Sequence, residues 1–303
     1  MTRIVLLGSN GQVGRALTQS LQPLGDVIAL SRDQCDFSKP ELLQSQIEAI
    51  SPDVIVNAAA YTAVDQAESE PDLALKVNAA APAALAATAC RCAALLVHYS
   101  TDYVYDGKKA SAYVEEDAPN PLSSYGRSKL AGDAAVMASG CDYLIFRSSW
   151  VYSAYGKNFM RTILRLAEER DTLSVVNDQF GAPTPAGMIA EATAHVLSMD
   201  IKKRCEGIFE SGLFHLTAQG ETSWHGFASL IVAEAKKRGR AMACREVLPI
   251  PTTQYPLPAL RPANSRLSCA KLKNRYALSL PSWQDGLSKV MDEFESSEQG
   301  LSL

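Results

Sequence analysis

Short apolar runs alternate with segments of helical spacing along the first half of the chain. The expected strands are Arg3–Leu7, Val27–Leu30, Asp53–Asn57, Leu95–Tyr99 and Tyr143–Arg147, and the expected helices are Gln12–Leu24, Glu41–Ile50, Ser69–Ala94 and Tyr125–Met137. Apolar strands that alternate with helices indicate βαβ units around a buried parallel sheet. We therefore predict an α/β fold with a doubly wound, Rossmann-like parallel sheet.

The alternation loosens after about residue 148. Further helices are expected at Phe159–Arg170, Gly187–Met199 and Trp224–Gly239, and prolines gather between residues 249 and 262. Because proline cannot continue a regular element, the proline segment is expected to be an ordered loop. We predict that residues 1–148 are mainly a dinucleotide-binding domain and that residues 149–303 are mainly a smaller C-terminal substrate-binding lobe, interleaved with the first.

Composition narrows the class of protein. The chain has 303 residues, 47% hydrophobic and 20% charged, with a net charge of −4. These values favour a globular protein and argue against nucleic acid or an anionic membrane as partner. We expect no secretory signal and no stretch that reaches the roughly 20 apolar residues of a membrane span. The seven scattered cysteines predict no disulfide framework and favour the cytoplasm.

A glycine-rich turn follows the first expected strand. Gly8, Gly11 and Gly14 form a G-x-x-G-x-x-G pattern that opens the first helix. Such glycines let a pyrophosphate approach backbone N–H groups at a helix N-terminus. Because the pattern has the strand–turn–helix context that this mechanism requires, it predicts a dinucleotide site.

The end of the second expected strand bears on the choice of cofactor. Ser31 and Arg32 stand where an NAD site holds a carboxylate for the ribose 2′-hydroxyl. A cationic side chain there suits a 2′-phosphate instead. We predict NADPH, with NADH as the alternative because Asp33 is close by.

A tyrosine and a lysine share one face of an expected helix. Tyr125 and Lys129 are four residues apart, and residues at that spacing are neighbours on a helix. A nearby ammonium lowers the pKa of a phenol toward the range that general acid catalysis needs. Thr101 ends a strand at the edge of the sheet where ligands bind, so its hydroxyl is expected to meet a substrate carbonyl.

These motifs resemble a known family. The glycine turn, Asn57-Ala-Ala-Ala, Ser100-Thr-Asp and Tyr125-x-x-x-Lys129 look like an extended short-chain dehydrogenase/reductase. Longer blocks resemble the dTDP-4-dehydrorhamnose reductases: residues 57–68, 98–104, 146–152, 177–184 and 261–265. The resemblance runs from residue 4 to about residue 285.

The resemblance implies a cofactor path and a substrate site. Along the cofactor it implies Gly11, Gln12 and Val13 at the pyrophosphate, Ser31 and Arg32 at the adenosine ribose, Asp36 and Phe37 at the adenine, and Ala60, Tyr61, Thr62 and Tyr99 toward the nicotinamide. Tyr125 would donate the proton, Lys129 would hold the nicotinamide ribose, and Thr101 would orient the carbonyl. Thr101, Asp102 and Trp150 would contact the nucleotide sugar. The implied reaction is the reduction of dTDP-4-dehydro-β-L-rhamnose to dTDP-β-L-rhamnose. The resemblance also implies that this product supplies rhamnose to surface polysaccharides such as O-antigen.

One departure from the resemblance concerns metal. Some members of the family dimerise through a magnesium ion held by three glutamates. The matching positions are Ala16, Gly187 and Glu293, of which one keeps a carboxylate. Because magnesium prefers carboxylate or phosphate oxygens, we expect no metal site. The oligomeric state stays open between monomer and homodimer.

Several alternatives stay open at this point. Trp150 also fits a core packing role, Asp102 fits a turn cap, and Arg261 and Asn264 fit either a loop brace or a phosphate contact. A nucleotide-sugar epimerase or dehydratase of the same fold would require acidic residues that Ser31, Arg32 and residues 103–104 do not supply. A regulatory subunit, such as that of methionine adenosyltransferase, has the same fold but needs no intact catalytic residues.

Overall fold

A six-stranded parallel sheet forms the centre of the computed structural model, which describes residues 1–300. The strands are β1 (Arg3–Leu7), β2 (Asp26–Leu30), β3 (Val54–Asn57), β4 (Leu95–Thr101), β5 (Asp142–Ser148) and β10 (Gly212–His215), in the order β10-β5-β4-β3-β1-β2. The doubly wound α/β fold expected from the sequence is confirmed. All carboxyl ends lie at one edge, where ligands bind in such sheets.

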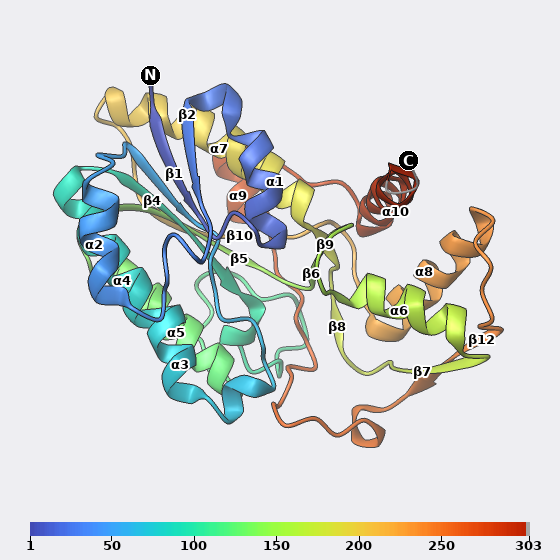
Figure 1. Cartoon of the computed structure of the whole chain (residues 1–303). Coiled ribbons are helices and arrows are strands. Elements are labelled where there is room, and N and C mark those ends of the chain that lie inside the picture. The colour runs from blue at the N-terminus through green and yellow to red at the C-terminus, as the bar shows by residue number, and fades with distance from the viewer. Residues whose placement is uncertain (301–303) are drawn as a thin grey trace.

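Helices cover both faces of this sheet (Figure 1). One face carries α2 (Pro40–Glu48), α3 (Pro71–Leu75), α4 (Ala81–Cys92) and α5 (Ser124–Met137), and the other carries α1 (Gln12–Ser20) and α7 (Ala186–Cys205). Leu85 and Ala89 of α4 pack with Ile55 of β3 on the first face, whereas Leu17 of α1 packs with Leu6 of β1 on the second. The inner strands are buried on both sides, which explains their nearly continuous apolar sequence.

The alanine-rich segment Pro71–Cys92 differs from the sequence expectation in two ways. It is long and apolar enough to cross a membrane by length and composition, with a mean hydropathy of 1.4, although no such stretch was expected. It is also not one regular helix, because a π-helical turn at residues 76–80 separates α3 from α4. Leu85 and Ala89 pack in the core of the sheet whereas Leu75 is exposed, so the apolar composition reflects partial burial inside the protein.

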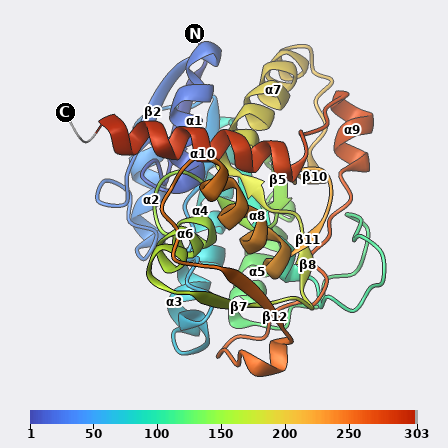
Figure 2. The ribbon, with the colours of Figure 1, turned by 90° about the vertical axis from the view of Figure 1, so that its right-hand side faces the viewer.

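A second lobe stands beside the carboxyl edge of the sheet (Figure 1). Its helices are α6 (Phe159–Glu169), α8 (Trp224–Lys237) and α10 (Trp283–Gly300), and Figure 2 shows α10 lying across the molecule above α8. Three short strand pairs support it: β6 (Val151–Tyr152) with β9 (Thr184–Pro185), β7 (Thr172–Val176) with β12 (Glu246–Ile250), and β8 (Phe180–Gly181) with β11 (Thr222–Ser223).

The chain passes between the two lobes more than once. After β9 it returns to the first sheet as α7 and β10, and β10 pairs with β5 in parallel. The helix α9 (Ala270–Tyr276) then follows the proline segment and packs beside β10. Residues beyond 149 therefore contribute both to the second lobe and to the central sheet, and the division at residue 148 stays a prediction.

Candidate active site

The glycine turn lies between β1 and α1 and is tightly enclosed. Gly8 has φ +76°, and a Cβ there would stand 2.7 Å from the backbone nitrogen of Ala59. A Cβ on Gly14 would stand 2.1 Å from the carbonyl oxygen of Gly8. Gly11 precedes α1 without a side-chain cap, so the first N–H groups of a nine-residue helix are left for an anion. This cradle fits the pyrophosphate of a dinucleotide.

Gln12 connects the glycine turn to the second lobe. Its Oε1 accepts hydrogen bonds from the hydroxyl of Ser153 at 2.9 Å and from Nδ2 of Asn158 at 3.0 Å. The guanidinium of Arg15 lies 4.0 Å from the ring centroid of Tyr155 in the same loop. The loop of residues 153–158 is thereby fixed beside the N-terminus of α1, with Val13 at the next position of that helix.

The residues expected at the adenosine end follow β2. Arg32 is exposed and the hydroxyl of Ser31 donates to Oε1 of Gln34 at 3.1 Å. Asp36 caps the next turn, and the backbone N–H of Ser38 holds the pKa of its carboxyl below the usual value. Phe37 is buried in the core with Leu43, so its side chain is committed to packing.

Asn78 fixes the segment after β3 against the helix that carries Tyr125. Its Oδ1 accepts from the backbone N–H of Tyr61 at 2.8 Å, and its Nδ2 donates to the carbonyl of Tyr61 and the hydroxyl of Ser128, each at 3.0 Å. Ala60 and Thr62, on either side of Tyr61, are exposed. Asn78 lies in the π-helical turn, a feature that often marks functional sites. Sequence reasoning had not singled it out.

Tyr125 and Thr101 meet at the carboxyl end of β4. Ser123 caps α5 by accepting from the backbone N–H of Gly126 at 3.1 Å, which sets Tyr125 in the first turn. Burial raises the pKa of Tyr125, whereas a hydrogen bond with Thr101 acts in the opposite direction. The ring of Tyr103 packs edge-on against Tyr125, with centroids 5.5 Å apart. The two residues expected at the substrate carbonyl are therefore adjacent.

Lys129 lies one turn further along α5 and is 2% exposed. Its Nζ donates to the carbonyl oxygen of Tyr99 at 2.6 Å and lies 3.5 Å from Nε2 of His98. Burial lowers the pKa of Lys129 to about 8, although Asp133 raises it. His98 in turn bonds to Nδ2 of Asn57 at 3.0 Å. His98 therefore contacts Asn57 through one ring nitrogen and lies close to Lys129 with the other.

Tyr99 points away from the tyrosine–lysine pair. Its hydroxyl lies 2.7 Å from Oγ1 of Thr193 in α7, and its ring packs near Phe146. The backbone carbonyl of Tyr99, rather than its side chain, contacts Lys129.

Asp102 brings an incompletely bonded carboxylate to the same place. It is 2% exposed, and its Oδ1 accepts from the hydroxyl of Thr101 at 3.1 Å. Its Oδ2 has no hydrogen-bond partner among the residues described. Burial raises the pKa of Asp102 to about 6, although the hydrogen bond from Thr101 acts to lower it. A buried acceptor without a donor beside Thr101 suits a hydroxyl group of a ligand.

Two tryptophans, one after β5 and one at the start of α8, stack on each other. Trp150 follows β5 with φ +49°, and its indole stacks on that of Trp224 at a centroid distance of 3.6 Å. Nε1 of Trp224 donates to Oε1 of Gln179 at 3.2 Å, and the indole of Trp150 lies against Gly181. Sequence reasoning identified Trp150 but placed Trp224 only as the start of a helix. The sequence signal available for Trp224 was its position directly after Ser223, the residue that caps α8.

Arg261 and Asn264 both brace the proline segment in this structure. Arg261 pairs with Asp65 of the first lobe at 2.7 Å, and the hydrogen bond from Arg261 lowers the pKa of the Asp65 carboxyl. Nδ2 of Asn264 donates to the carbonyls of Lys109 and Ser111 at 2.7 and 2.8 Å. The two lobes are thus tied together at the proline segment.

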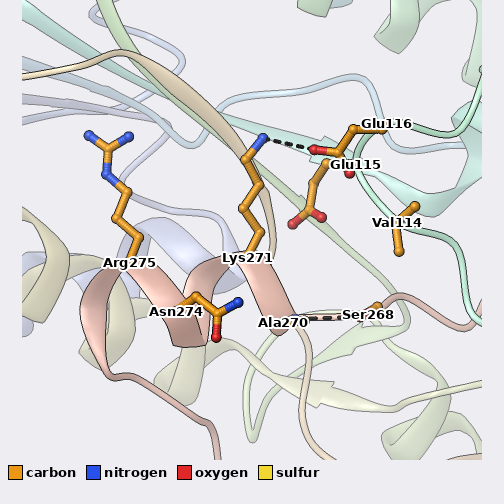
Figure 3. A pocket seen from close by; sticks show the side chains of 8 residues that line it. All are labelled: Val114, Glu115, Glu116, Ser268, Ala270, Lys271, Asn274 and Arg275. Carbon is orange, nitrogen blue, oxygen red and sulfur yellow. Dashed lines mark hydrogen bonds and ion pairs between the residues drawn. The ribbon is translucent and has the colours of Figure 1, made fainter.

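A separate hollow of about 450 Å³ lies beside α9 (Figure 3). Glu115 and Glu116 line one side and Lys271 and Arg275 line the other, with an ion pair of 3.4 Å between Lys271 and Glu116. It contains neither the glycine turn nor the tyrosine–lysine pair, so the chemistry expected from the sequence lies elsewhere. Within residues 1–300, no group of three or more histidine, cysteine, aspartate or glutamate side chains is arranged to hold a metal ion.

The sheet, the glycine cradle and the paired Tyr125 and Lys129 define an oxidoreductase of the extended short-chain dehydrogenase/reductase class. A family model described as the RmlD substrate binding domain matches residues 1–296. The chain belongs to this family.

Relatives of known name agree with this assignment. The dTDP-4-dehydrorhamnose reductase of Burkholderia thailandensis is 51% identical, over 93% of this chain and 95% of the relative. The enzyme of the same name from Escherichia coli K12 is 47% identical, over 96% of this chain and 97% of the relative. A crystal structure of dTDP-4-dehydrorhamnose reductase from Bacillus anthracis in complex with NADP is 35% identical, with a TM-score of 0.85 over 97% of this chain and 100% of that one.

Proposed function

We propose that the protein reduces dTDP-4-dehydro-β-L-rhamnose to dTDP-β-L-rhamnose with NADPH, the last step of dTDP-rhamnose synthesis. The observation that carries the proposal is the contact of Tyr125 with Thr101, beside the buried Lys129, in a chain of this family. An intact catalytic arrangement favours an enzyme over a regulatory subunit of the same fold.

The cofactor fits along the carboxyl edge of the sheet. The N-terminus of α1, with Gly11, Gln12 and Val13, would hold the pyrophosphate, and the exposed Arg32 with Ser31 would meet a 2′-phosphate. The segment of Ala60, Tyr61 and Thr62, held by Asn78, would line the path toward Lys129. When bound, NADPH supplies the hydride.

The protein's own part in the reaction is to place the ketone and deliver a proton. Thr101 would hold the C4 carbonyl oxygen by a hydrogen bond, and the phenol of Tyr125 would give that oxygen its proton as the carbonyl is reduced. The ammonium of Lys129 stabilises the phenolate that remains, because a nearby positive charge favours the ionised phenol. Burial of Thr101 and Lys129 excludes water from them and strengthens these interactions.

The sugar nucleotide would lie between the catalytic residues and the second lobe. Oδ2 of Asp102 is free to accept a hydrogen bond from a sugar hydroxyl, and the stacked Trp150 offers an apolar face. Both residues stand at the ends of strands of the central sheet, within reach of one ligand. We place the enzyme in the cytoplasm, since all seven cysteines are free thiols, and leave its assembly as monomer or homodimer.

The test is oxidation of NADPH by the purified protein in the presence of enzymatically generated dTDP-4-dehydrorhamnose, followed by absorbance. Tyr125→Phe should lower kcat by about 10²–10⁴-fold, the usual contribution of a general acid. It should leave NADPH binding unchanged. Tight NADPH binding without oxidation by the wild-type protein would refute the proposed substrate.

A further inference from the structure

A buried carboxylate lies next to Lys129 and takes no direct part in the reaction described above. Asp133 follows Lys129 by four residues on α5 and is fully buried, so Tyr125, Lys129 and Asp133 share one face of the helix. Its Oδ2 accepts a hydrogen bond from Ser100 at 2.9 Å, and its Oδ1 lies 3.8 Å from Nε2 of His98.

Asp133 also has a second cation as partner. Nε and Nη2 of Arg147 lie 3.1 and 3.0 Å from Oδ2 of Asp133, and Arg147 is 2% exposed. Nη1 of Arg147 donates to the hydroxyl of Tyr105 at 2.8 Å, and that hydroxyl lies 2.9 Å from Nε2 of His215. The block between α5, β4 and β5 therefore holds two cations, Lys129 and Arg147, and one carboxylate.

The other titratable groups that face this block do not balance the charge. Burial, together with Lys129, lowers the pKa of His98 well below its usual value, so the imidazole is neutral. Burial likewise lowers the pKa of His215 to about 3. Tyr125 and Tyr105 are phenols with pKa values raised by burial, and Asp102 lies on the Thr101 side of the site. Asp133 thus forms an ion pair with Arg147, and it is also the carboxylate that raises the pKa of Lys129.

We propose that Asp133 is a positioning residue that keeps Lys129 protonated, and that Arg147 opposes it by competing for the same carboxylate. This inference rests on the proposed function for its effect on turnover. Without Asp133, two buried cations remain close together, and only Lys129 can lose its proton because arginine stays charged. Without Arg147, the carboxylate has Lys129 as its sole cation.

The two substitutions are therefore expected to act in opposite directions. If turnover requires the charged ammonium, activity falls as the pH rises through the pKa of Lys129. Asp133→Asn should move this alkaline limb of kcat to lower pH by about one unit or more, and Arg147→Met should move it to higher pH. Loss of folded protein lowers activity at every pH and cannot produce opposite displacements.

The decisive measurement follows Lys129 directly and needs no substrate. The protein is labelled with ¹³C at the lysine Cε, and the resonance of Lys129 is identified as the one absent from Lys129→Arg. The chemical shift of this resonance is followed against pH. Exposed lysines titrate near pH 10, so they are distinguished by their higher midpoint. The pH midpoint of the Lys129 titration should be lower in Asp133→Asn and higher in Arg147→Met than in the wild type. The alkaline limb of kcat should move in the same direction in each variant. Asp200→Asn is the matched control, because Asp200 is also fully buried and bonds to Tyr276 at 2.6 Å away from the site.

A milder variant covers the case in which Asp133→Asn fails to fold. Ser100→Ala removes one hydrogen bond from Asp133 and should displace the midpoint in the same direction by a smaller amount. Equal midpoints in the wild type and all these variants would overturn the inference. Displaced midpoints in a protein that does not oxidise NADPH would instead support the role of Asp133 in charging Lys129 and refute the proposed substrate.

Discussion

Replacing Gly14 with alanine tests the glycine cradle most severely. The added Cβ would stand 2.1 Å from the carbonyl oxygen of Gly8 and 2.9 Å from Cα of Ser9, whereas ordinary contacts begin at 3.4 Å. Both neighbours are backbone atoms of the turn, so no side chain can rotate away. The turn itself must move by roughly 1 Å, a misplacement that costs up to about 10²-fold when it occurs in a site.

The expected loss follows from this displacement. The N–H groups of the first turn of α1 would move with the turn away from the pyrophosphate. We expect the Kd for NADPH to rise about 10- to 100-fold, which corresponds to ~1.4–2.8 kcal/mol. Overpacking of this kind also costs about 1–3 kcal/mol of folding free energy.

The assay is a fluorescence titration with NADPH, together with thermal unfolding. Gly187→Ala is the matched control, since nothing lies within 4 Å of a Cβ there. Gly187 lies in the first turn of α7, so alanine should leave both the stability and the Kd close to those of the wild type. Gly11→Ala, with its nearest contact at 3.3 Å, should give an intermediate effect. A Kd for Gly14→Ala equal to that of the wild type would refute the reasoning.

Three further expectations concern the cofactor, the substrate and pH. Arg32→Ala should weaken NADPH about tenfold and leave NADH unchanged, because only NADPH carries the 2′-phosphate; equal losses for both cofactors in binding titrations would contradict this. Trp224→Ala removes the indole stacked on Trp150, so the KM for the nucleotide sugar should rise several-fold to about tenfold in initial-rate kinetics, with NADPH binding as the control. Asp102 has its pKa raised by burial from 3.8 to about 6, so the folded protein keeps a proton that the unfolded chain releases, and stability falls as the pH rises through this window. The unfolding midpoint of Asp102→Asn should not decline in this way as the pH rises. Relative to the wild type, the variant should therefore become ~1–3 kcal/mol more stable between pH 4 and pH 7. Stability curves that run parallel in the two proteins would contradict the raised pKa.

The sheet and its helices were largely predictable because local patterns determine them. The strands β1 to β5 read as short apolar runs because most of their residues are buried, with β2 half-buried at the sheet edge. The expected bounds lie within two residues of those found. The strand β10 was missed, because its four residues follow a loop and only pairing with β5 identifies them. The helix α10 was missed as well. Its apolar face is defined by contacts with the second lobe.

The positions of the candidate site residues were predictable where a motif carries its own geometry. The glycine turn and the tyrosine–lysine spacing each place groups through local structure, so the sequence was sufficient for them. The partners of Lys129 depend on tertiary pairing. Arg147 in a buried strand was nevertheless a visible signal, because a charge among apolar residues requires a counter-charge. Asp133, four residues after Lys129, was the nearest candidate on the same helix face.

The contacts between the lobes set how the proposed catalytic residues lie relative to Trp150 and Trp224, the proposed substrate contacts. Tyr125 belongs to the central sheet's lobe, whereas Trp224 belongs to the other. Gln12 joins the lobes at the pyrophosphate end, and Asp65 with Arg261 joins them at the proline segment. Neither contact takes part in the proposed reaction. Both ends of the site are therefore held by residues whose substitution should change KM without altering the proton transfer itself.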